Sequence, residues 1–272
     1  MEISTWRVVV LAGIILCWII FLIRARKLGY SFYTVFPWLL FGLLVGTLGA
    51  HLFNKLIPDL AGMGNAAYSF KGTTVIGSIV FCLLFSFFYI KYIIKIPPMQ
   101  LLDASAFAFP LSIFIGRMGC LLNGCCYGKI APNSVNPSLL SVFTIPVGFY
   151  VEPSSAWHDY LGVPHDSLAW NLPLLLMINV FLILMVTETM YRNRIKWELY
   201  PGTVFAATSM LYAGGRFFIE FMRKEDGVHN ALFNPWQLAL LVLFFASLLW
   251  FCVSLYRRSQ NLSMHSLKEE EP

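Results

Sequence analysis

The sequence predicts an all-α, polytopic integral membrane protein with about seven transmembrane helices. Hydrophobic residues make up 58% of the 272 residues and charged residues only 12%, and the mean hydropathy is +0.70, far from the values of soluble domains. The apolar runs are about 18 to 23 residues long, close to the roughly 20 residues that a helix needs to cross a bilayer. They lack the short alternating pattern of a membrane β-barrel. The net charge of +5 needs no nucleic acid to explain it, because the cytoplasmic loops of membrane proteins are enriched in basic residues.

The expected spans lie within residues 1–258, which we treat as one seven-span membrane domain. They cover residues 6–23, 35–53, 73–94, 101–122, 169–190, 201–221 and 235–256. Basic residues follow the first span instead of preceding it, and no small-residue cleavage site is present, so we expect this span to stay in the membrane as an anchor. The polar tail at 259–272 ends in glutamates and a proline, and we expect it to be disordered.

The placement of lysine and arginine predicts the orientation of the chain. The odd-numbered connections and the tail carry more of these residues than the N-terminus and the even-numbered connections. The positive-inside rule therefore predicts an N-terminus outside and a cytoplasmic C-terminus. The connection at 123–168 then faces the exterior. It is long and contains several prolines and aromatic residues, so we expect a small extracytoplasmic cap in place of a passive linker.

A first polar cluster closes the fourth span. Its sequence is Gly116-Arg-Met-Gly-Cys-Leu-Leu-Asn-Gly-Cys-Cys-Tyr-Gly128. Arg117 lies within or at the edge of the hydrocarbon, where a charge costs roughly 2.5 to 3.5 kcal/mol on insertion scales and usually faces a partner, a cavity or an anionic ligand. The glycines permit positive φ and close approach of a ligand or a second backbone. This stretch is therefore expected to break the helix into a tight polar loop.

A second polar cluster lies in the outer part of the sixth span. Tyr212, Arg216, Glu220 and Arg223 follow one another at spacings of four, four and three, which places them on one face of a helix. Arg216 and Glu220 can pair with each other, either as a structural ion pair or as a group that directs the remaining arginine donors to a ligand.

The two clusters together suggest a phosphate-binding site. Arg117 closes the fourth span and Arg216 lies in the outer part of the sixth, so both are expected at the same depth near the outer leaflet. Planar guanidinium groups suit bidentate binding of phosphate. In a membrane, the abundant ligand of this kind is a phospholipid headgroup.

Three cysteines, Cys120, Cys125 and Cys126, lie in the glycine-rich loop. A disulfide in an oxidising exterior, a reactive thiol, and small residues that permit close packing are all open explanations. We expect no metal site and no cofactor, because the loop offers too few ligands.

Three further titratable residues have competing explanations. Lys71 enters the third span from the outer side and is either a snorkelling anchor or a catalytic group. His165, just before the fifth span, is a candidate proton acceptor. Asp103 begins the fourth span, where it is expected to cap the helix N-terminus.

With both clusters in view, the chain resembles the prolipoprotein diacylglyceryl transferase family. These bacterial membrane enzymes move diacylglyceryl from phosphatidylglycerol to the lipobox cysteine of a lipoprotein precursor. The first cluster is similar to the family pattern Gly-Arg-x-Gly-Asn-Phe-x-Asn-Gly-Glu-x-x-Gly. The second, Tyr212-x-x-x-Arg-Phe-x-x-Glu-Phe-x-Arg223, matches the family's sixth span, and Asp103 stands at the family's offset before the arginine. The resemblance covers about residues 45 to 256.

The resemblance implies roles for individual residues. Arg117 and Arg216 become the essential arginines, and Tyr212, Asn123, Glu220 and Arg223 become neighbours that organise the substrate. It also implies that the protein is a transferase of the bacterial cytoplasmic (inner) membrane, with phosphatidylglycerol or a similar phospholipid and a lipoprotein precursor as partners.

The chain also departs from the family pattern. Lys71 replaces the histidine of the family's Ser-Phe-His-Gly-Gly, and Cys120 and Cys125 replace its asparagine and glutamate. The family's His-Pro-Ser-Gln-Leu-Tyr-Glu appears only as His165-Asp-Ser-Leu-Ala-Trp-Asn171. Lys71 or His165 would then help to deprotonate the acceptor, and burial beside arginines would favour a neutral lysine.

Two alternatives follow from these departures. One is a divergent paralogue that modifies another acceptor through a Cys125 or Cys126 thiol. The other is a non-catalytic protein that binds or transports lipid and keeps the two arginines without a catalytic base.

Overall fold

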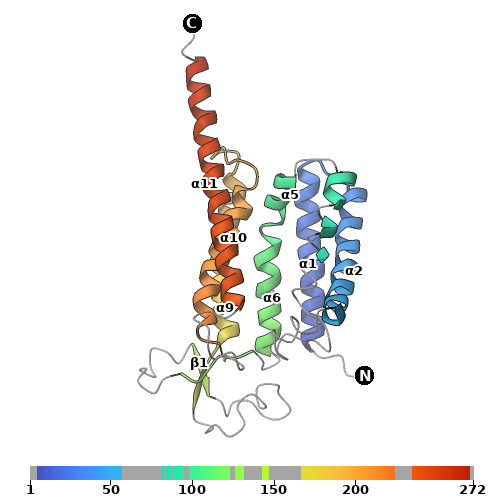
Figure 1. The fold of residues 1–272 in the computed structure, drawn as a ribbon, viewed down its shortest axis with the longest axis vertical. Coiled ribbons are helices and arrows are strands. Elements are labelled where there is room, and N and C mark those ends of the chain that lie inside the picture. The colour runs from blue at the N-terminus through green and yellow to red at the C-terminus, as the bar shows by residue number, and fades with distance from the viewer. Residues whose placement is uncertain are drawn as a thin grey trace. The chain divides into compact units, whose positions relative to one another are not determined.

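The computed structural model describes nine segments of the chain: residues 5–56, 81–82, 84–86, 88–94, 98–122, 126–131, 143–146, 167–223 and 235–269. The chain divides into two compact units, one formed by Met1–Cys17 with Leu102–Pro272 and the other by Trp18–Leu101. The elements are α1 (Thr5–Lys27), α2 (Phe32–Leu56), a π-helical turn η1 (Ile90–Ile94), α5 (Pro98–Ser105), α6 (Ala108–Leu122), β1 (Thr144–Pro146), β2 (Leu168–Trp170), α9 (Leu172–Asn193), α10 (Thr203–Glu220) and α11 (Pro235–Glu269) (Figure 1).

The predicted all-α membrane fold is confirmed. Five helices in the described part of the chain are long and apolar enough to cross a membrane: Val8–Lys27, Phe32–Leu52, Met99–Leu122, Leu172–Asn193 and Trp236–Gln260. They correspond to the first, second, fourth, fifth and seventh predicted spans. The predicted sixth span is helix α10, which is not among these five, and the third lies partly outside the described residues. The count of seven therefore stays a prediction.

The fourth predicted span consists of two helices, α5 and α6, with a turn at Ala106 and Phe107 between them. Pro110 explains the turn. It has no N–H to donate to the carbonyl of Ala106, four residues earlier, and its ring clashes with that carbonyl in a continuous helix. Leu111 resumes the helical pattern, since its N–H donates to the carbonyl of Phe107 at 3.2 Å.

Asp103 caps a different helix from the one predicted. It lies near the end of α5, and its carboxylate accepts hydrogen bonds from the backbone N–H of Gly202 (2.8 Å) and of Phe205 (2.9 Å). These N–H groups belong to the first turn of α10, which has no intrahelical acceptors for them. Gly202, the N-cap residue, has a φ of 92° and makes no side-chain cap of its own. Asp103 therefore supplies the cap from another element.

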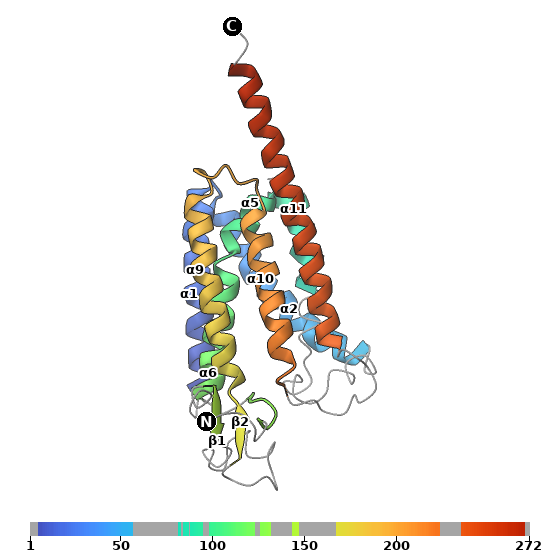
Figure 2. The same cartoon turned by 90° about the vertical axis from the view of Figure 1, so that its left-hand side faces the viewer.

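Three helices of the larger unit, α9, α10 and α11, run side by side, with α9 also against α6 (Figures 1 and 2). Asn171 begins α9, because its side-chain oxygen accepts from the N–H of Leu174 at 3.2 Å and Pro173 suits the first helical turn. Deeper in the α9 and α10 contact, the hydroxyl groups of Thr187 and Thr208 hydrogen bond at 2.8 Å, and both residues are buried.

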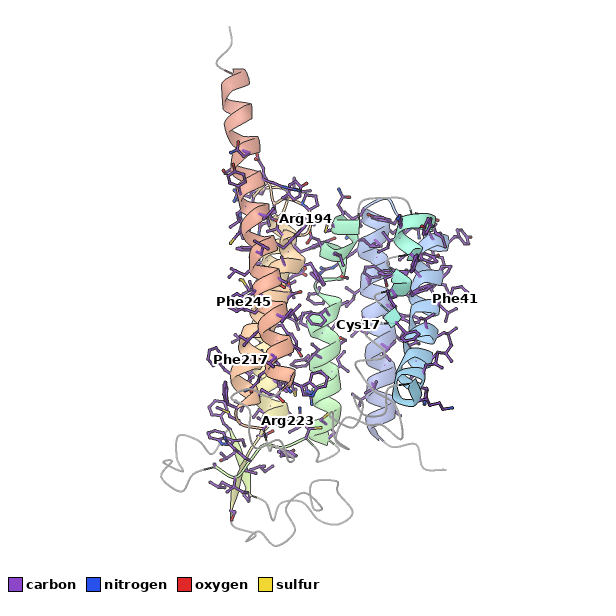
Figure 3. All side chains as sticks on the ribbon, in the orientation of Figure 1. Cys17, Phe41, Arg194, Phe217, Arg223 and Phe245 are labelled. Carbon is purple, nitrogen blue, oxygen red and sulfur yellow. The ribbon has the colours of Figure 1, made fainter. Side chains whose placement is uncertain are left out.

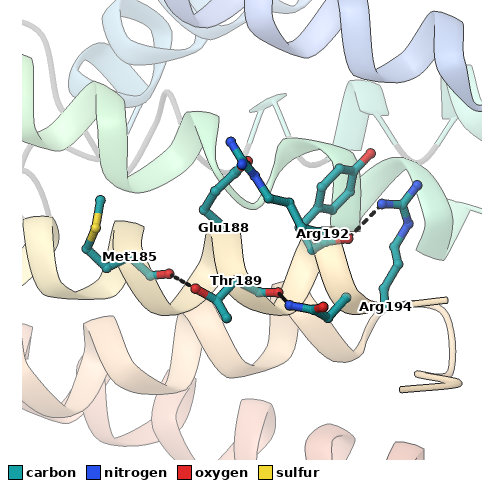
Figure 4. Close-up of polar contacts among 7 residues, drawn as sticks. Met185, Glu188, Thr189, Arg192 and Arg194 are labelled. Carbon is teal, nitrogen blue, oxygen red and sulfur yellow. Dashed lines mark hydrogen bonds and ion pairs between the residues drawn. The ribbon is translucent and has the colours of Figure 1, made fainter. Parts of the chain in front are cut away.

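The end of α9 that is remote from the strands is rich in local polar contacts (Figure 4). Arg192 Nε donates to Glu188 Oε1 at 2.7 Å, and Thr189 Oγ1 donates to the carbonyl of Met185 at 2.8 Å. Arg194 Nη1 donates to the carbonyl of Tyr191 at 2.7 Å, and its guanidinium lies 3.9 Å from the centre of the Tyr191 ring. Cations at a helix C-terminus are favoured by the helix dipole.

The tail expected to be disordered is helical instead. Helix α11 continues without interruption to Glu269. No glycine or proline lies between Ser259 and Glu269, and the lysine and glutamates near its end are good helix formers. The polar composition of the tail therefore did not predict the end of the helix.

The smaller unit packs through aromatic side chains. Trp38 Nε1 donates to Ser86 Oγ at 3.2 Å, and Tyr89 Oη donates to the carbonyl of Thr34 at 3.0 Å. The ring of Phe21 lies 5.7 Å from that of Trp38. These contacts join α1 to α2, and α2 to Ser86 and Tyr89.

Candidate functional site

The end of the glycine-rich loop and the residues that follow it, 126–131, are joined to the end of α10 and to β2. The N–H of Gly128 donates to the carbonyl of Trp170 at 2.8 Å, and the N–H of Lys129 donates to the carbonyl of Met222 at 2.9 Å. Gly128 also forms an antiparallel bridge with Arg223. A Cβ at Gly128 would collide with the Met222 carbonyl and lie 2.8 Å from the Cβ of Trp170. Glycine is therefore required here by the closeness of two backbones.

A small antiparallel sheet supports this junction. Strand β1 pairs with β2, with Thr144 opposite Trp170, and Ala131 donates its N–H to the carbonyl of Leu168 at 2.7 Å. Figure 2 shows both strands beyond the ends of α6 and α9. Part of the connection at 123–168 is thus ordered structure; whether this connection forms a complete cap stays a prediction.

Arg117 lies on α6 and is partly buried. Its Nη1 is 3.9 Å from the Sγ of Cys120, one helical turn later and itself buried. Sulfur is a weak acceptor, so this contact orients the guanidinium without neutralising its charge.

Arg216 lies on α10 and is only 8% exposed. Its Nη2 forms an ion pair with Glu220 Oε2, as the spacing of four predicts. Glu220 is 1% exposed and also lies 3.4 Å from Arg223 Nη1 through its other oxygen. Arg216 Nη1 is buried and has no hydrogen-bond partner among the described residues. Arg216 therefore keeps one buried donor available for a ligand.

The two arginines are near enough to interact. The charge of Arg216 interacts with those of Glu220 and Arg117, and with the side chains of Tyr212 and Cys126. Tyr212 also connects the helices that carry them, because its ring meets that of Phe109 on α6 edge to face at 5.1 Å.

This grouping has an excess of positive charge. Glu220, one described carboxylate, pairs with Arg216 and Arg223, and Arg117 adds a third positive charge that acts on Arg216. Like charges in a poorly solvated place repel each other, and a bound anion would relieve that repulsion. Figure 3 shows Arg223 at the strand end of the helices and Arg194 at the opposite end. The grouping therefore belongs to one end of the unit.

Of the remaining predicted site residues, only Cys126 lies in the described part of the chain. Cys126 is exposed and has a φ of 68°, an unusual conformation for a residue other than glycine. Lys71, Asn123, Cys125 and His165 lie outside the described residues.

One polar residue near the site was not singled out from the sequence. Asn179, in the second turn of α9, packs its carboxamide against Gly215, where an added Cβ would collide with its Oδ1 and lie 2.7 Å from its Nδ2. That Nδ2 is buried and has no partner in the described part of the chain. An amide in the middle of an apolar span is itself a signal of a functional or interhelical contact.

Comparison with known proteins gives the family of the chain. A family model described as prolipoprotein diacylglyceryl transferase matches residues 1–253. The chain is 28% identical over 242 residues to the phosphatidylglycerol–prolipoprotein diacylglyceryl transferase of Ehrlichia ruminantium (strain Welgevonden), covering 85% of this chain and 83% of that protein.

Two further relatives have the same description. The protein of Dehalococcoides mccartyi (strain CBDB1) is 29% identical over 163 residues, with 59% of this chain and 54% of that protein covered. The second such transferase of Clostridium perfringens (strain 13 / Type A) is 22% identical over 253 residues, with 89% and 87% covered. Because the family model spans nearly the whole chain, the chain belongs to the prolipoprotein diacylglyceryl transferase family.

Proposed function

We propose that this protein transfers diacylglyceryl from phosphatidylglycerol, or a similar phospholipid, to the cysteine thiol of a lipoprotein precursor. The observation that carries the proposal is the approach of Arg117 to Arg216, where Arg216 retains a buried donor without a partner among the described residues. Two guanidinium groups in this arrangement suit a phosphate, and family membership gives the phosphate its source.

In the proposed reaction, the thiolate sulfur of the acceptor attacks the glyceryl carbon that bears the phosphate. A C–S bond forms as the C–O bond to the phosphate breaks, and the electron pair stays on the departing phosphate oxygen. Arg117 and Arg216 stabilise the charge that develops there, which is the main stabilising contribution available to such a site. Tyr212, Asn123, Glu220 and Arg223 organise the lipid around them.

The acceptor thiol must lose its proton before or during attack. We propose Lys71 or His165 as the base, with the proton held on the side chain after transfer. A lysine can serve only if its ammonium form is destabilised, which burial or a neighbouring positive charge would do.

We further propose that the protein lies in a bacterial cytoplasmic membrane with its N-terminus outside. The reaction then takes place at the outer leaflet, where Gly128 and the strands join the end of α10. The charge distribution of the connections supports this orientation.

The direct test is transfer in vitro. Purified protein is incubated with vesicles containing labelled phosphatidylglycerol and a lipobox peptide, and mass spectrometry detects diacylglyceryl on the peptide together with released glycerol phosphate. We expect both products in equal amounts. No transfer under conditions in which an authentic family enzyme works would refute the proposed activity, and lipid binding without turnover would favour the non-catalytic alternative.

Cys126 decides between the main proposal and the thiol-dependent paralogue. Cys126 is exposed and interacts electrostatically with Arg216, so it is the described cysteine best placed to attack a lipid. We expect Cys126→Ser, alone and with Cys125→Ser, to retain transfer within about twofold, because the acceptor thiol belongs to the peptide; loss of a true nucleophile would abolish turnover. Diacylglyceryl found on this protein's own cysteines would support the paralogue instead.

A further inference from the structure

We infer that Asn179 is an additional substrate-binding residue that donates a hydrogen bond from its carboxamide to an oxygen of the phospholipid, next to the Arg216 donor. This inference rests on the proposed function, because it assumes that a phospholipid occupies the site. It concerns a residue in α9, a helix that contributes none of the three site arginines, Arg117, Arg216 and Arg223. The donor would place a third helix, besides α6 and α10, in contact with the lipid.

The position of Asn179 is determined by the contact between α9 and α10. Leu176 and Ile183, three residues before and four after, are buried, so Asn179 lies on the inward face of α9. It meets α10 at Gly215, where the absence of a Cβ leaves room for the carboxamide. Gly215 directly precedes Arg216, so the amide meets α10 at the level of the arginine backbone, which is about 1.5 Å further along the helix axis.

The contact between α9 and α10 also contains a hydrogen bond that is purely structural. Thr187 and Thr208 hydrogen bond to each other at 2.8 Å, about two helical turns from the Asn179 and Gly215 contact. Each of these two hydroxyl groups therefore has the other as a hydrogen-bond partner. The Asn179 amide nitrogen is buried without an acceptor among the described residues.

Two such donors belong to the same level of the α9 and α10 contact, because Asn179 packs against Gly215 and Arg216 is the next residue of α10. Arg216 Nη1 and Asn179 Nδ2 are both buried and both lack a partner in the described segments. Buried donors are costly unless they are hydrogen bonded, so the occurrence of two at this level of α10 indicates a ligand that supplies acceptors. A phospholipid provides these as phosphate oxygens and as ester carbonyl oxygens, and either can receive the Asn179 hydrogen bond.

The geometry also supplies a second way to remove the donor without changing Asn179. In Gly215→Ala, the new methyl group would occupy the place of the carboxamide. The amide is the end of a flexible side chain, so it can rotate away while the helices stay packed. Asn179→Leu removes the donor and keeps a side chain of similar size.

The experiment measures KM and kcat for phosphatidylglycerol in mixed vesicles, together with the midpoint of thermal unfolding. We expect Asn179→Leu and Gly215→Ala each to raise KM about five- to tenfold, the effect of losing one hydrogen bond to a bound ligand. The double variant should be no worse than either single variant, because both remove the same interaction. Thr187→Val is the matched control: it should lower the unfolding midpoint and leave KM unchanged.

A lipid with ether-linked chains distinguishes the two acceptors. If Asn179 donates to an ester carbonyl, the unaltered protein should lose affinity for the ether lipid and Asn179→Leu should not discriminate between the lipids. If it donates to the phosphate, the variant should lose affinity for both lipids equally. Either pattern supports the inference.

Three results would overturn it: an unchanged KM in Asn179→Leu, multiplied effects in the double variant, or recovery of KM when Gly215→Ala is added to Asn179→Ala. The last result would mean that Asn179 only fills space. If the unaltered protein transfers no lipid, the proposed function fails. In that case, the affinity of the same variants for phosphatidylglycerol in nanodiscs tests the role of Asn179 in binding independently of transfer.

Discussion

Glu220 is the residue on which the arrangement of the arginines depends. It is 1% exposed and contacts both Arg216 and Arg223. A buried ion pair contributes little net stability compared with an apolar pair, but removal of one partner leaves a buried charge uncompensated, at a cost of about 3 to 5 kcal/mol. Glu220 therefore offsets the free-energy cost of burying the Arg216 guanidinium. Any contact between Arg216 and a ligand depends on this ion pair.

We accordingly expect Glu220→Gln to lower the midpoint of thermal unfolding by several degrees, because Arg216 would lose its described counter-charge. Differential scanning fluorimetry in detergent measures this. The matched control is Glu188→Gln, which breaks the pair with Arg192, whose side chain is 76% exposed. An exposed pair of this kind contributes about 0 to 1 kcal/mol. Equal shifts in the two variants would contradict a buried-charge role for Glu220.

The guanidinium shape of Arg117 and Arg216 should matter as well as their charge. A lysine keeps the positive charge but loses the planar fork that binds phosphate through two N–H groups. We expect Arg117→Lys and Arg216→Lys each to lower kcat/KM for lipid transfer about hundredfold, comparable to the loss of a preorganised donor at a developing charge. Arg257→Lys is the control, because Arg257 donates to Tyr200 Oη at 3.0 Å in an exposed place. Activity retained in both site variants would exclude bidentate phosphate binding.

At the scale of the helix, Asp103 shows how one element positions another. Its carboxylate caps α10 across 99 residues of sequence, and α10 carries Arg216 and Glu220 at its other end. A cap contributes about 0.5 to 2 kcal/mol. Loss of the cap should therefore loosen the start of α10 first.

We expect Asp103→Ala to lower the unfolding midpoint and to speed hydrogen exchange in the first turn of α10, near Gly202 and Phe205. Asp103→Asn should have a smaller effect, since its amide retains one oxygen acceptor. Hydrogen–deuterium exchange with mass spectrometry measures the exchange rate of the first turn of α10 in each of the two variants. Faster exchange confined to α5, with α10 unchanged, would show that the carboxylate stabilises its own helix and not α10.

The structure also shows which kinds of contact can be predicted from sequence. The Arg216 and Glu220 pair was predictable because a helix brings residues four apart together. The partners of Asp103 and of Asn179 were not, because they depend on which helices pack and in what register. The turn before α6 follows from Pro110, a local signal that the hydropathy of the span concealed. The long extent of α11 was missed because polarity indicates exposure and does not by itself end a helix.

At the scale of the whole molecule, the proposal requires the site to face the exterior. Within the larger unit, the end that carries Arg223 and the strands is opposite the end that carries Arg194 (Figure 3). The second end has the basic residues that the positive-inside rule assigns to the cytoplasm. Residues 126–131 and residues 194–198 should therefore lie on opposite sides of the membrane.

This can be tested with a membrane-impermeant maleimide on cells whose outer envelope has been removed and whose cytoplasmic membrane is still closed. Cys126 and Lys196 are both exposed, so in a background whose other cysteines are replaced, Cys126 should label before permeabilisation. In the same background without Cys126, Lys196→Cys should label only after permeabilisation. The reverse pattern would place the arginines at the cytoplasmic leaflet, and a lipoprotein precursor exposed outside the cell could not reach them. Labelling of both positions from outside would instead show that the two ends do not lie across one bilayer.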